Sequence, residues 1–308
     1  MTLSEKSTER VDLLFELAKR NGSLISIHEL TRLLATSTSE QEVAKAIMHD
    51  PHLSSRFEIT DGYVVERRPG GGASDLREES RNRVRARSNM ALAVRFERLL
   101  RPARFRMVAV SGSTSYGSAS SSKDLDLFCV APAGRLWYSL TWGLIMARVF
   151  ALVSPRSPCI CLSCIMDERY AFSLFSRAQG PLFARDAIET KVVRGRDTHS
   201  SLMRAAGWIT AFYPGAYESS EFSAAPLPTM NSPSVLERVT NRFIFITVGK
   251  YMRLKSALLN RRLRTAHRSW DVFEIQCSED HLVYESKRYA SMRQRYTEAF
   301  DFMPDVRR

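Results

Sequence analysis

One segment in the middle of the chain, VAVSGSTSYGSASSSKDLDLFCV (108–130), constrains the fold more than any other. It opens with an apolar run that predicts a buried strand, and this strand ends in a turn of small residues, Ser-Gly-Ser (111–113). The alternating run DLDLFCVAP (124–132) predicts a second strand. Within that strand Asp124 and Asp126 stand at positions i and i+2, so their side chains point to the same face.

The two carboxylates and the small turn together predict a site for a metal ion and a phosphate. Two carboxylates on one face repel each other unless a cation lies between them, so Asp124 and Asp126 are a candidate Mg²⁺ site. Gly112 has no side chain, which lets the backbone approach a ligand closely. Ser113 and the residues after it can start a helix, whose free N–H groups bind phosphate. Metal ions bridging the acids and a nucleoside triphosphate would support in-line phosphoryl transfer.

This joint pattern resembles the signature of the DNA polymerase β-type nucleotidyltransferase superfamily, in which Gly-Ser is followed by two acids that alternate with apolar residues. The resemblance implies that Gly112 and Ser113 contact phosphate and that Asp124 and Asp126 bind Mg²⁺. The expected nucleotide-binding residues are Ser111, Gly112, Ser113 and Lys123. A weaker similarity, which extends to AAGWITAFYP (205–214), is to bacterial nucleotidyltransferase-domain proteins, some with an N-terminal winged helix. The implied reaction moves a nucleotide from an NTP to a small molecule, a tRNA end or a protein.

The sequence departs from this superfamily at the third carboxylate, which usually lies on the strand after the intervening helix. Here that strand is CICLSCIM (159–166), and it contains no acid. Alternate residues from Cys161 to Asp167 are expected on one face, which puts Ser163 in the place of the third carboxylate. Asp167, at the strand's end, is the third candidate catalytic residue. The alternative is a nucleic-acid-binding or regulatory protein with a degenerate nucleotidyltransferase domain.

The chain on either side of this core predicts an α+β protein in three parts. Helical spacing over 8–20, 28–35 and 42–50 precedes two alternating runs that flank Asp61-Gly62, a strong hairpin signal. Three helices followed by a hairpin is the order of a winged helix-turn-helix. The glycine-rich stretch RPGGGAS (68–74) is a predicted linker. The expected parts are a winged helix-turn-helix (1–68), a nucleotidyltransferase α/β core with a small mixed sheet (75–170) and a C-terminal helical region (171–308).

Charge favours partners that carry phosphate. The chain has 45 Lys and Arg against 33 Asp and Glu, a net charge of +12, and an excess of this kind concentrates polyanions at a surface. The segment 249–268 contains no acid and is either a track for RNA, DNA or anionic lipid or the solvated face of a core helix. We therefore expect an NTP as substrate, with RNA or DNA as a further partner through basic surfaces.

Three observations predict a cytoplasmic protein without a membrane span. The apolar segment 137–153 is short for a span and contains Arg148, so a buried helix packed on a sheet is the better interpretation. The first residues show no signal-peptide pattern, and the five cysteines are an odd number, which favours reduced thiols. The spacing of Cys159, Cys161 and Cys164 is poor for zinc and favours buried small hydrophobes.

Overall fold

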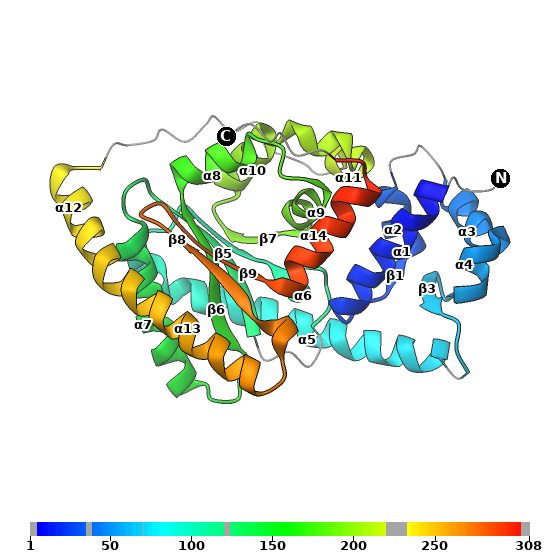
Figure 1. Ribbon diagram of the computed structural model, residues 1–308, viewed down its shortest axis with the longest axis horizontal. Helices are drawn as coiled ribbons and strands as arrows, with labels where there is room; N and C mark the ends of the chain where they lie inside the picture. The colour runs from blue at the N-terminus through cyan, green and yellow to red at the C-terminus, as the bar shows by residue number, and fades with distance from the viewer. Residues whose placement is uncertain (1–4, 35–38, 70, 120–123, 220–232, 303–308) are drawn as a thin grey trace.

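The computed structural model describes residues 5–34, 39–69, 71–119, 124–219 and 233–302, and it mixes helices and strands throughout (Figure 1). The helices are α1 (Glu5–Arg20), α2 (Ile27–Leu33), α3 (Glu40–His49), α4 (Pro51–Arg56), α5 (Gly71–Leu99), α6 (Gly112–Ser115), α7 (Leu136–Val153), α8 (Glu168–Phe175), α9 (Pro181–Glu189), α10 (Arg196–Ala205), α11 (Pro214–Glu218), α12 (Val235–Ile244), α13 (Lys250–Thr265) and α14 (Lys287–Ala299). The strands are β1 (Ile25–Ser26), β2 (Phe57–Thr60), β3 (Tyr63–Glu66), β4 (Met107–Val110), β5 (Asp124–Ala131), β6 (Cys159–Asp167), β7 (Lys191–Arg194), β8 (Phe273–Cys277) and β9 (His281–Ser286). Short helical turns are η1 (Arg101–Ala103), η2 (Gly207–Ala211), η3 (Phe245–Gly249) and η4 (Ser269–Asp271). The chain is therefore α+β, as the sequence predicts.

The smaller sheet has the order β1-β3-β2 and lies among the N-terminal helices. Its hairpin confirms the turn predicted at Asp61-Gly62, because β2 and β3 pair antiparallel with Thr60 opposite Tyr63. Asp61 and Gly62 both have positive φ, 51° and 78°, which is the conformation that a two-residue hairpin turn needs. The N-terminal end of α3 is fixed by a capping box in which Ser39 and Glu42 exchange hydrogen bonds.

The expected linker at 68–74 is wrong, because a helix occupies most of it. The 29-residue helix α5 starts at Gly71 and runs to Leu99. Its first turn packs onto the hairpin, where a Cβ on Gly72 would lie 3.3 Å from the side chains of Glu58 and Thr60. The glycines therefore allow a close approach between helix and hairpin, and they do not form a flexible connection.

The larger sheet has six strands in the order β7-β4-β5-β6-β9-β8. β5 and β6 pair in parallel and all other neighbours pair antiparallel, so the sheet is mixed. Helix α7 makes the crossover that a parallel pair requires. Three of the strands, β7, β8 and β9, come from the region beyond residue 170 that the sequence analysis expects to be helical. That expectation is therefore corrected: the C-terminal region completes the sheet.

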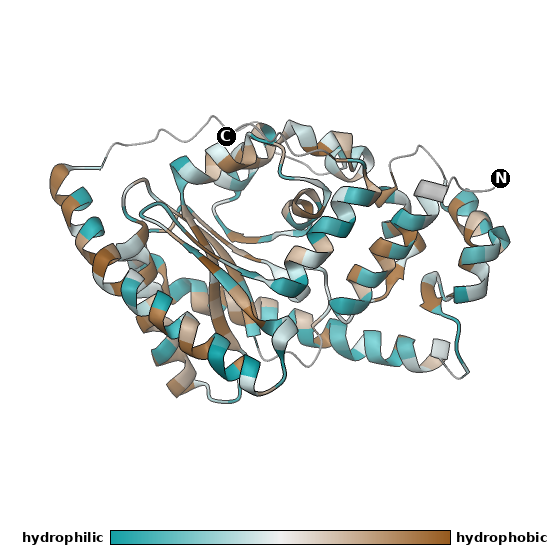
Figure 2. Ribbon diagram, in the orientation of Figure 1, coloured by the Kyte–Doolittle hydropathy of each residue, from teal (hydrophilic) through white to brown (hydrophobic). Residues whose placement is uncertain are grey.

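Each face of this sheet is covered by its own apolar cluster. Met107, Ala109 and Phe128 belong to a cluster that continues into α8, α9, α10, α14 and the N-terminal helices. The alternate residues Val108 and Leu127 belong to the opposite cluster, which includes side chains of α5 and α7. Figure 2 shows the corresponding band of hydrophobic strands between the helical layers. Because successive side chains of a strand point to opposite faces, alternate residues of the same strand contribute to two different cores.

Helix α7 is only partly the buried helix that its sequence predicts. It packs on β6 through its first half, where Leu136, Trp137 and Leu140 are fully buried. Its last turns are open to solvent, with Leu152 82% exposed and Val153 77% exposed. Among the described residues, α7 is the one helix long and apolar enough to cross a membrane. Helices α12 and α13, which lie beside it in Figure 1, also expose apolar residues, with Leu236 76% and Leu254 61% exposed.

Candidate functional site

The candidate site begins at the first residues of β5, where the predicted pair of acids lies. Leu125 and Leu127 are fully buried in one core, so Asp124 and Asp126 project from the other face of the strand. Asp124 is exposed and Asp126 is half-buried. Neither carboxylate takes part in an ion pair with any residue that the structure describes. Within the described part of the chain, the pair is therefore an accumulation of negative charge without an ion-pair partner.

Gly112 brings the turn after β4 against this pair. Its φ is +61°, a conformation that L side chains rarely adopt, and a Cβ at this position would lie 2.7 Å from Oδ2 of Asp126. The backbone N–H of Ser111 donates to the carbonyl oxygen of Asp126 at 3.0 Å. Glycine is therefore required here for two reasons: the backbone is left-handed, and a side chain would collide with the carboxylate of Asp126.

The residues after Gly112 form the short helix α6. Ser111 and Ser113, on either side of the glycine, are partly exposed, and no side chain caps the first turn. Tyr116, which follows the helix, donates from its hydroxyl to Oδ1 of the half-buried Asp186 at 2.5 Å. Tyr289 of α14 donates to the other oxygen of Asp186 at 2.6 Å. These bonds tie the turn to α9 and α14 and hold it in position beside β5.

The adjacent strand β6 contributes two uncharged partners to Asp126. The hydroxyl of Ser163 donates to Oδ1 of Asp126 at 3.5 Å, and the thiol of Cys161 is hydrogen-bonded to the same carboxylate. Ser163 thus lies beside the acid pair, as the sequence predicts. The thiol contact was missed, because it depends on the register that sets Cys161 opposite Asp126. Cys161 is not simply a buried hydrophobe, and Cys159 is exposed.

A bulge in β6 overturns the expectation that Cys161, Ser163, Ile165 and Asp167 share one face. Asp126 pairs with Cys161 and Phe128 pairs with Cys164, so β6 has one residue more than β5 between these points. The extra residue inverts the alternation after it, and Ile165 lies in the core on the opposite face. The period of two applies only while the ladder is regular.

The structure does not bring Asp167 to the acid pair. It pairs with Ala131, five residues beyond Asp126 along β5, which is about 16 Å of strand. Its carboxylate caps α8 by accepting from the N–H of Tyr170 at 2.9 Å, and it also accepts from the N–H of Gly134 at 3.3 Å. An acid at this position is therefore explained by its role as the N-cap of α8. Lys123, the fourth expected nucleotide-binding residue, lies outside the described residues.

Burial and like charge determine the protonation of the site. Burial, and then the charge of Asp124, raise the pKa of Asp126, while hydrogen bonds from Cys161 and Ser163 lower it. Burial and the two carboxylates raise the pKa of Cys161 to about 12, so its thiol is neutral and acts as a donor. A cation at the pair would relieve the repulsion that raises the pKa of Asp126.

Comparison with known proteins adds no relative. The sequence matches no protein-family model, no curated protein and no solved structure. The function of the chain therefore has to be inferred from the residues and geometry of this site.

Proposed function

We propose that this chain is a Mg²⁺-dependent nucleotidyltransferase, and that Asp124 and Asp126 hold the metal. The observation that carries the proposal is the contact of Gly112 with the carboxylate of Asp126, at a position where any Cβ would stand 2.7 Å from Oδ2. It joins the small-residue turn to the acid pair, as a site that holds both metal and phosphate requires. Ser111, Gly112 and Ser113 are the proposed phosphate contacts, together with Lys123, which directly precedes Asp124 in sequence.

The acid pair suits Mg²⁺ in its chemistry. Mg²⁺ is commonly held by one or two carboxylates and completes its shell with water and substrate phosphates. Asp124 and Asp126 supply two such carboxylates, with no ion-pair partner in the described part of the chain. The described residues contain no group of three His, Cys, Asp or Glu side chains that could hold a metal. The remaining ligands are therefore assigned to the triphosphate and to water.

In the proposed reaction an acceptor oxygen attacks the α-phosphorus of an NTP, the bond to pyrophosphate breaks, and the acceptor's proton passes to solvent. When bound, Mg²⁺ supplies neutralisation of the phosphate charge. The protein's own contribution is placement: the turn and β5 hold phosphate and carboxylates against each other. Cys161 and Ser163 are neutral near pH 7 and cannot serve as the base, and Asp167 is engaged elsewhere.

The finer assignment of the fold belongs to the same proposal. We infer that β4, β5 and β6 with α6 and α7 form a nucleotidyltransferase core, and that the N-terminal unit is a winged helix. The order α1, β1, α2, α3, α4, β2, β3 and the three-stranded antiparallel sheet support the second inference. RNA or DNA remains a proposed partner, on the basis of the net charge of +12.

A second candidate function is a regulatory or nucleic-acid-binding protein in which transfer has been lost. It is favoured by Ser163, whose hydroxyl lies beside Asp126 where the superfamily resemblance implies a third carboxylate. On this alternative the pair still binds Mg²⁺ and nucleotide but does not catalyse transfer.

The test is to incubate the full chain with Mg²⁺, cell extract and each α-labelled triphosphate in turn (ATP, GTP, CTP and UTP). We expect label transfer with at least one triphosphate and its loss in Asp124→Asn and Asp126→Asn. The matched control is Glu274→Gln, which removes one negative charge from an exposed strand residue without an ion pair among the described residues. Nucleotide binding without transfer would select the second function. Equal activity in all three variants would exclude the acid pair from the reaction.

A further inference from the structure

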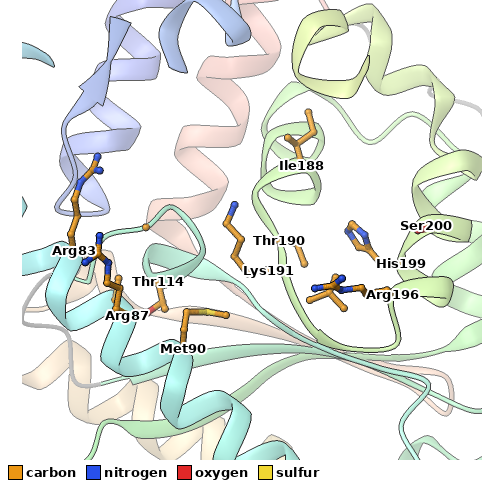
Figure 3. Close-up of a pocket in the computed structure, with 13 residues that line it drawn as sticks. Arg83, Arg87, Met90, Thr114, Ile188, Thr190, Lys191, Arg196, His199 and Ser200 are labelled. Atoms are coloured by element: carbon orange, nitrogen blue, oxygen red, sulfur yellow. The ribbon is translucent and has the colours of Figure 1, made fainter. Parts of the chain in front are cut away.

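A pocket of about 820 Å³ opens between α5, the end of α6, β7 and the start of α10 (Figure 3). Arg83 and Arg87 line it from α5, Lys191 from β7 and Arg196 from α10. Its volume is in the range of pockets that hold nucleotide-sized molecules. Neither Asp124 nor Asp126 is among its lining residues, so it is distinct from the acid pair.

The lining of this pocket is strongly and one-sidedly basic. Four of its residues are Arg or Lys, and no Asp or Glu is among the described residues that line it. Figure 3 shows Arg83 and Arg87 on one side, Arg196 on the other and Lys191 between them. These cations come from three different elements that meet around one space. An anion placed there would be attracted from several directions at once.

Two of these cations have no ion-pair partner among the residues that the structure describes. Arg83 pairs with Glu79 at 2.6 Å and Lys191 with Glu189 at 3.6 Å. Arg87 and Arg196, which are both exposed, form no ion pair with any described residue. Their guanidinium groups can therefore donate to a ligand without breaking an internal ion pair.

The arrangement is also unfavourable for the protein alone. Arg83 and Arg87 are four residues apart on α5, where like charges destabilise a helix. Arg196 is the first residue of α10, where the helix dipole favours an anion over a cation, and Asp197 is the one acid of that first turn. Gly195 precedes it, and no side chain caps the first turn. A bound anion would offset each of these repulsions.

We propose that this pocket binds the phosphate groups of a soluble small molecule without requiring a divalent metal. Phosphate is the anion that matches several arginines, since each guanidinium can donate two parallel hydrogen bonds to its oxygens. The phosphate can belong to a nucleoside polyphosphate or to a sugar phosphate. The pocket shares a segment with the acid pair: Gly112 contacts Asp126, while Thr114 and Gly117 line the pocket. A phosphorylated acceptor bound here would therefore lie near the proposed transferase site.

The test is isothermal titration calorimetry of the full chain in EDTA with tripolyphosphate, ATP and ribose 5-phosphate. We expect at least one probe to bind, and Arg87→Gln with Arg196→Gln to weaken it 10-fold or more. The matched control, Arg81→Gln with Arg98→Gln, removes two exposed charges of α5 that do not line the pocket and should change affinity less than 2-fold. Lys191→Gln is a second pocket variant if the arginine pair fails to fold. If ATP and tripolyphosphate both bind, the pocket recognises the polyphosphate chain. If only ribose 5-phosphate binds, the pocket recognises a sugar phosphate.

The same titration separates this proposal from the transferase. Asp124→Asn with Asp126→Asn should abolish transfer and leave binding in EDTA unchanged, because the pocket contains neither acid. If the wild-type chain shows no transfer, the proposed function fails but the binding proposal for the pocket still stands or falls on the titration. The proposal is overturned if no probe binds wild-type protein in EDTA, or if the control pair weakens binding as much as the pocket pair.

Discussion

The carboxylate of Asp126 lies directly against Gly112, so that a Cβ on the glycine would be 2.7 Å from Oδ2. Asp126 lies on β5, and Gly112 lies in the turn that follows the neighbouring antiparallel strand β4. The N–H of Ser111 donates to the carbonyl oxygen of Asp126 beside the contact. The turn and the acid pair are therefore one structural unit, and a substitution in either should change the position and stability of the other.

Gly112→Ala tests this contact, with Gly117→Ala as its control. Both glycines have positive φ, 61° and 75°, and each alanine should lose about 1–2 kcal/mol from the backbone alone. Only Gly112 has the carboxylate nearby, since nothing lies within 4 Å of a Cβ at Gly117. We expect Gly112→Ala to lose about 1–3 kcal/mol more in urea unfolding. Displacement of Asp126 should lower transfer on the order of 100-fold.

The coupling itself can be measured in a background that lacks the carboxylate. In Asp126→Ala the close contact is gone, so Gly112→Ala should then lose no more stability than Gly117→Ala does. An equal extra loss in both backgrounds would show that the glycine is required for a reason other than Asp126.

Asp126→Asn should stabilise the protein near neutral pH in EDTA. Burial and Asp124 raise the pKa of Asp126, so the folded state holds this proton more tightly than the unfolded state. Stability therefore falls as pH rises from the unfolded to the folded pKa, and the full penalty applies above the folded pKa. Thermal midpoints from pH 3 to 8 should show an advantage of Asp126→Asn that is present at pH 8 and disappears at the acid end.

In the presence of Mg²⁺ the wild-type chain should become more stable than Asp126→Asn. Metal bound to the folded state at 100 times its Kd adds about 2.7 kcal/mol, and the wild-type chain should gain this while Asp126→Asn does not. The measurement is the thermal midpoint across a Mg²⁺ titration, with Glu274→Gln again as the charge-matched control. An identical Mg²⁺ response in wild type and Asp126→Asn would argue against metal at this pair.

Asp167 should prove to be a structural residue. Its carboxylate accepts from the N–H of Tyr170, and asparagine can also make this cap. We expect Asp167→Asn to keep transfer activity, and Asp167→Ala to lose about 1 kcal/mol of stability with activity per folded molecule retained. A loss of transfer in Asp167→Asn as deep as in Asp124→Asn would instead return it to the reaction.

The cysteines of β6 should differ widely in reactivity. With a pKa of about 12, the thiol of Cys161 is roughly one ten-thousandth thiolate at pH 8, and only the thiolate reacts. Cys159, two residues earlier, is exposed. Iodoacetamide followed by peptide mass spectrometry should find Cys159 modified first, and Cys159→Ser should remove the fast phase. Rapid labelling of Cys161 would contradict its hydrogen bond to Asp126.

Local sequence determined the parts of this protein whose physics is local. Alternation in β5 is enough to place Asp124 and Asp126 on one face, because a regular strand repeats every two residues. The Asp61-Gly62 turn follows equally from short-range preferences. The glycine-rich start of α5 predicts a linker, and this prediction is wrong because the hairpin that these glycines approach is a tertiary neighbour.

Tertiary structure decided the remainder. The four-residue strand β7 pairs with β4, and β9, which carries β8 at the sheet edge, pairs with β6. These partners are distant in sequence, and strand preference depends mainly on such context. The bulge in β6 is likewise visible only in the register with β5, and it sends Ile165 and Asp167 away from the acid pair. The basic pocket joins Arg83 and Arg87 to Arg196, more than one hundred residues later in the chain. No local pattern encodes that meeting, because it results from packing α5 and α10 beside the edge strand β7.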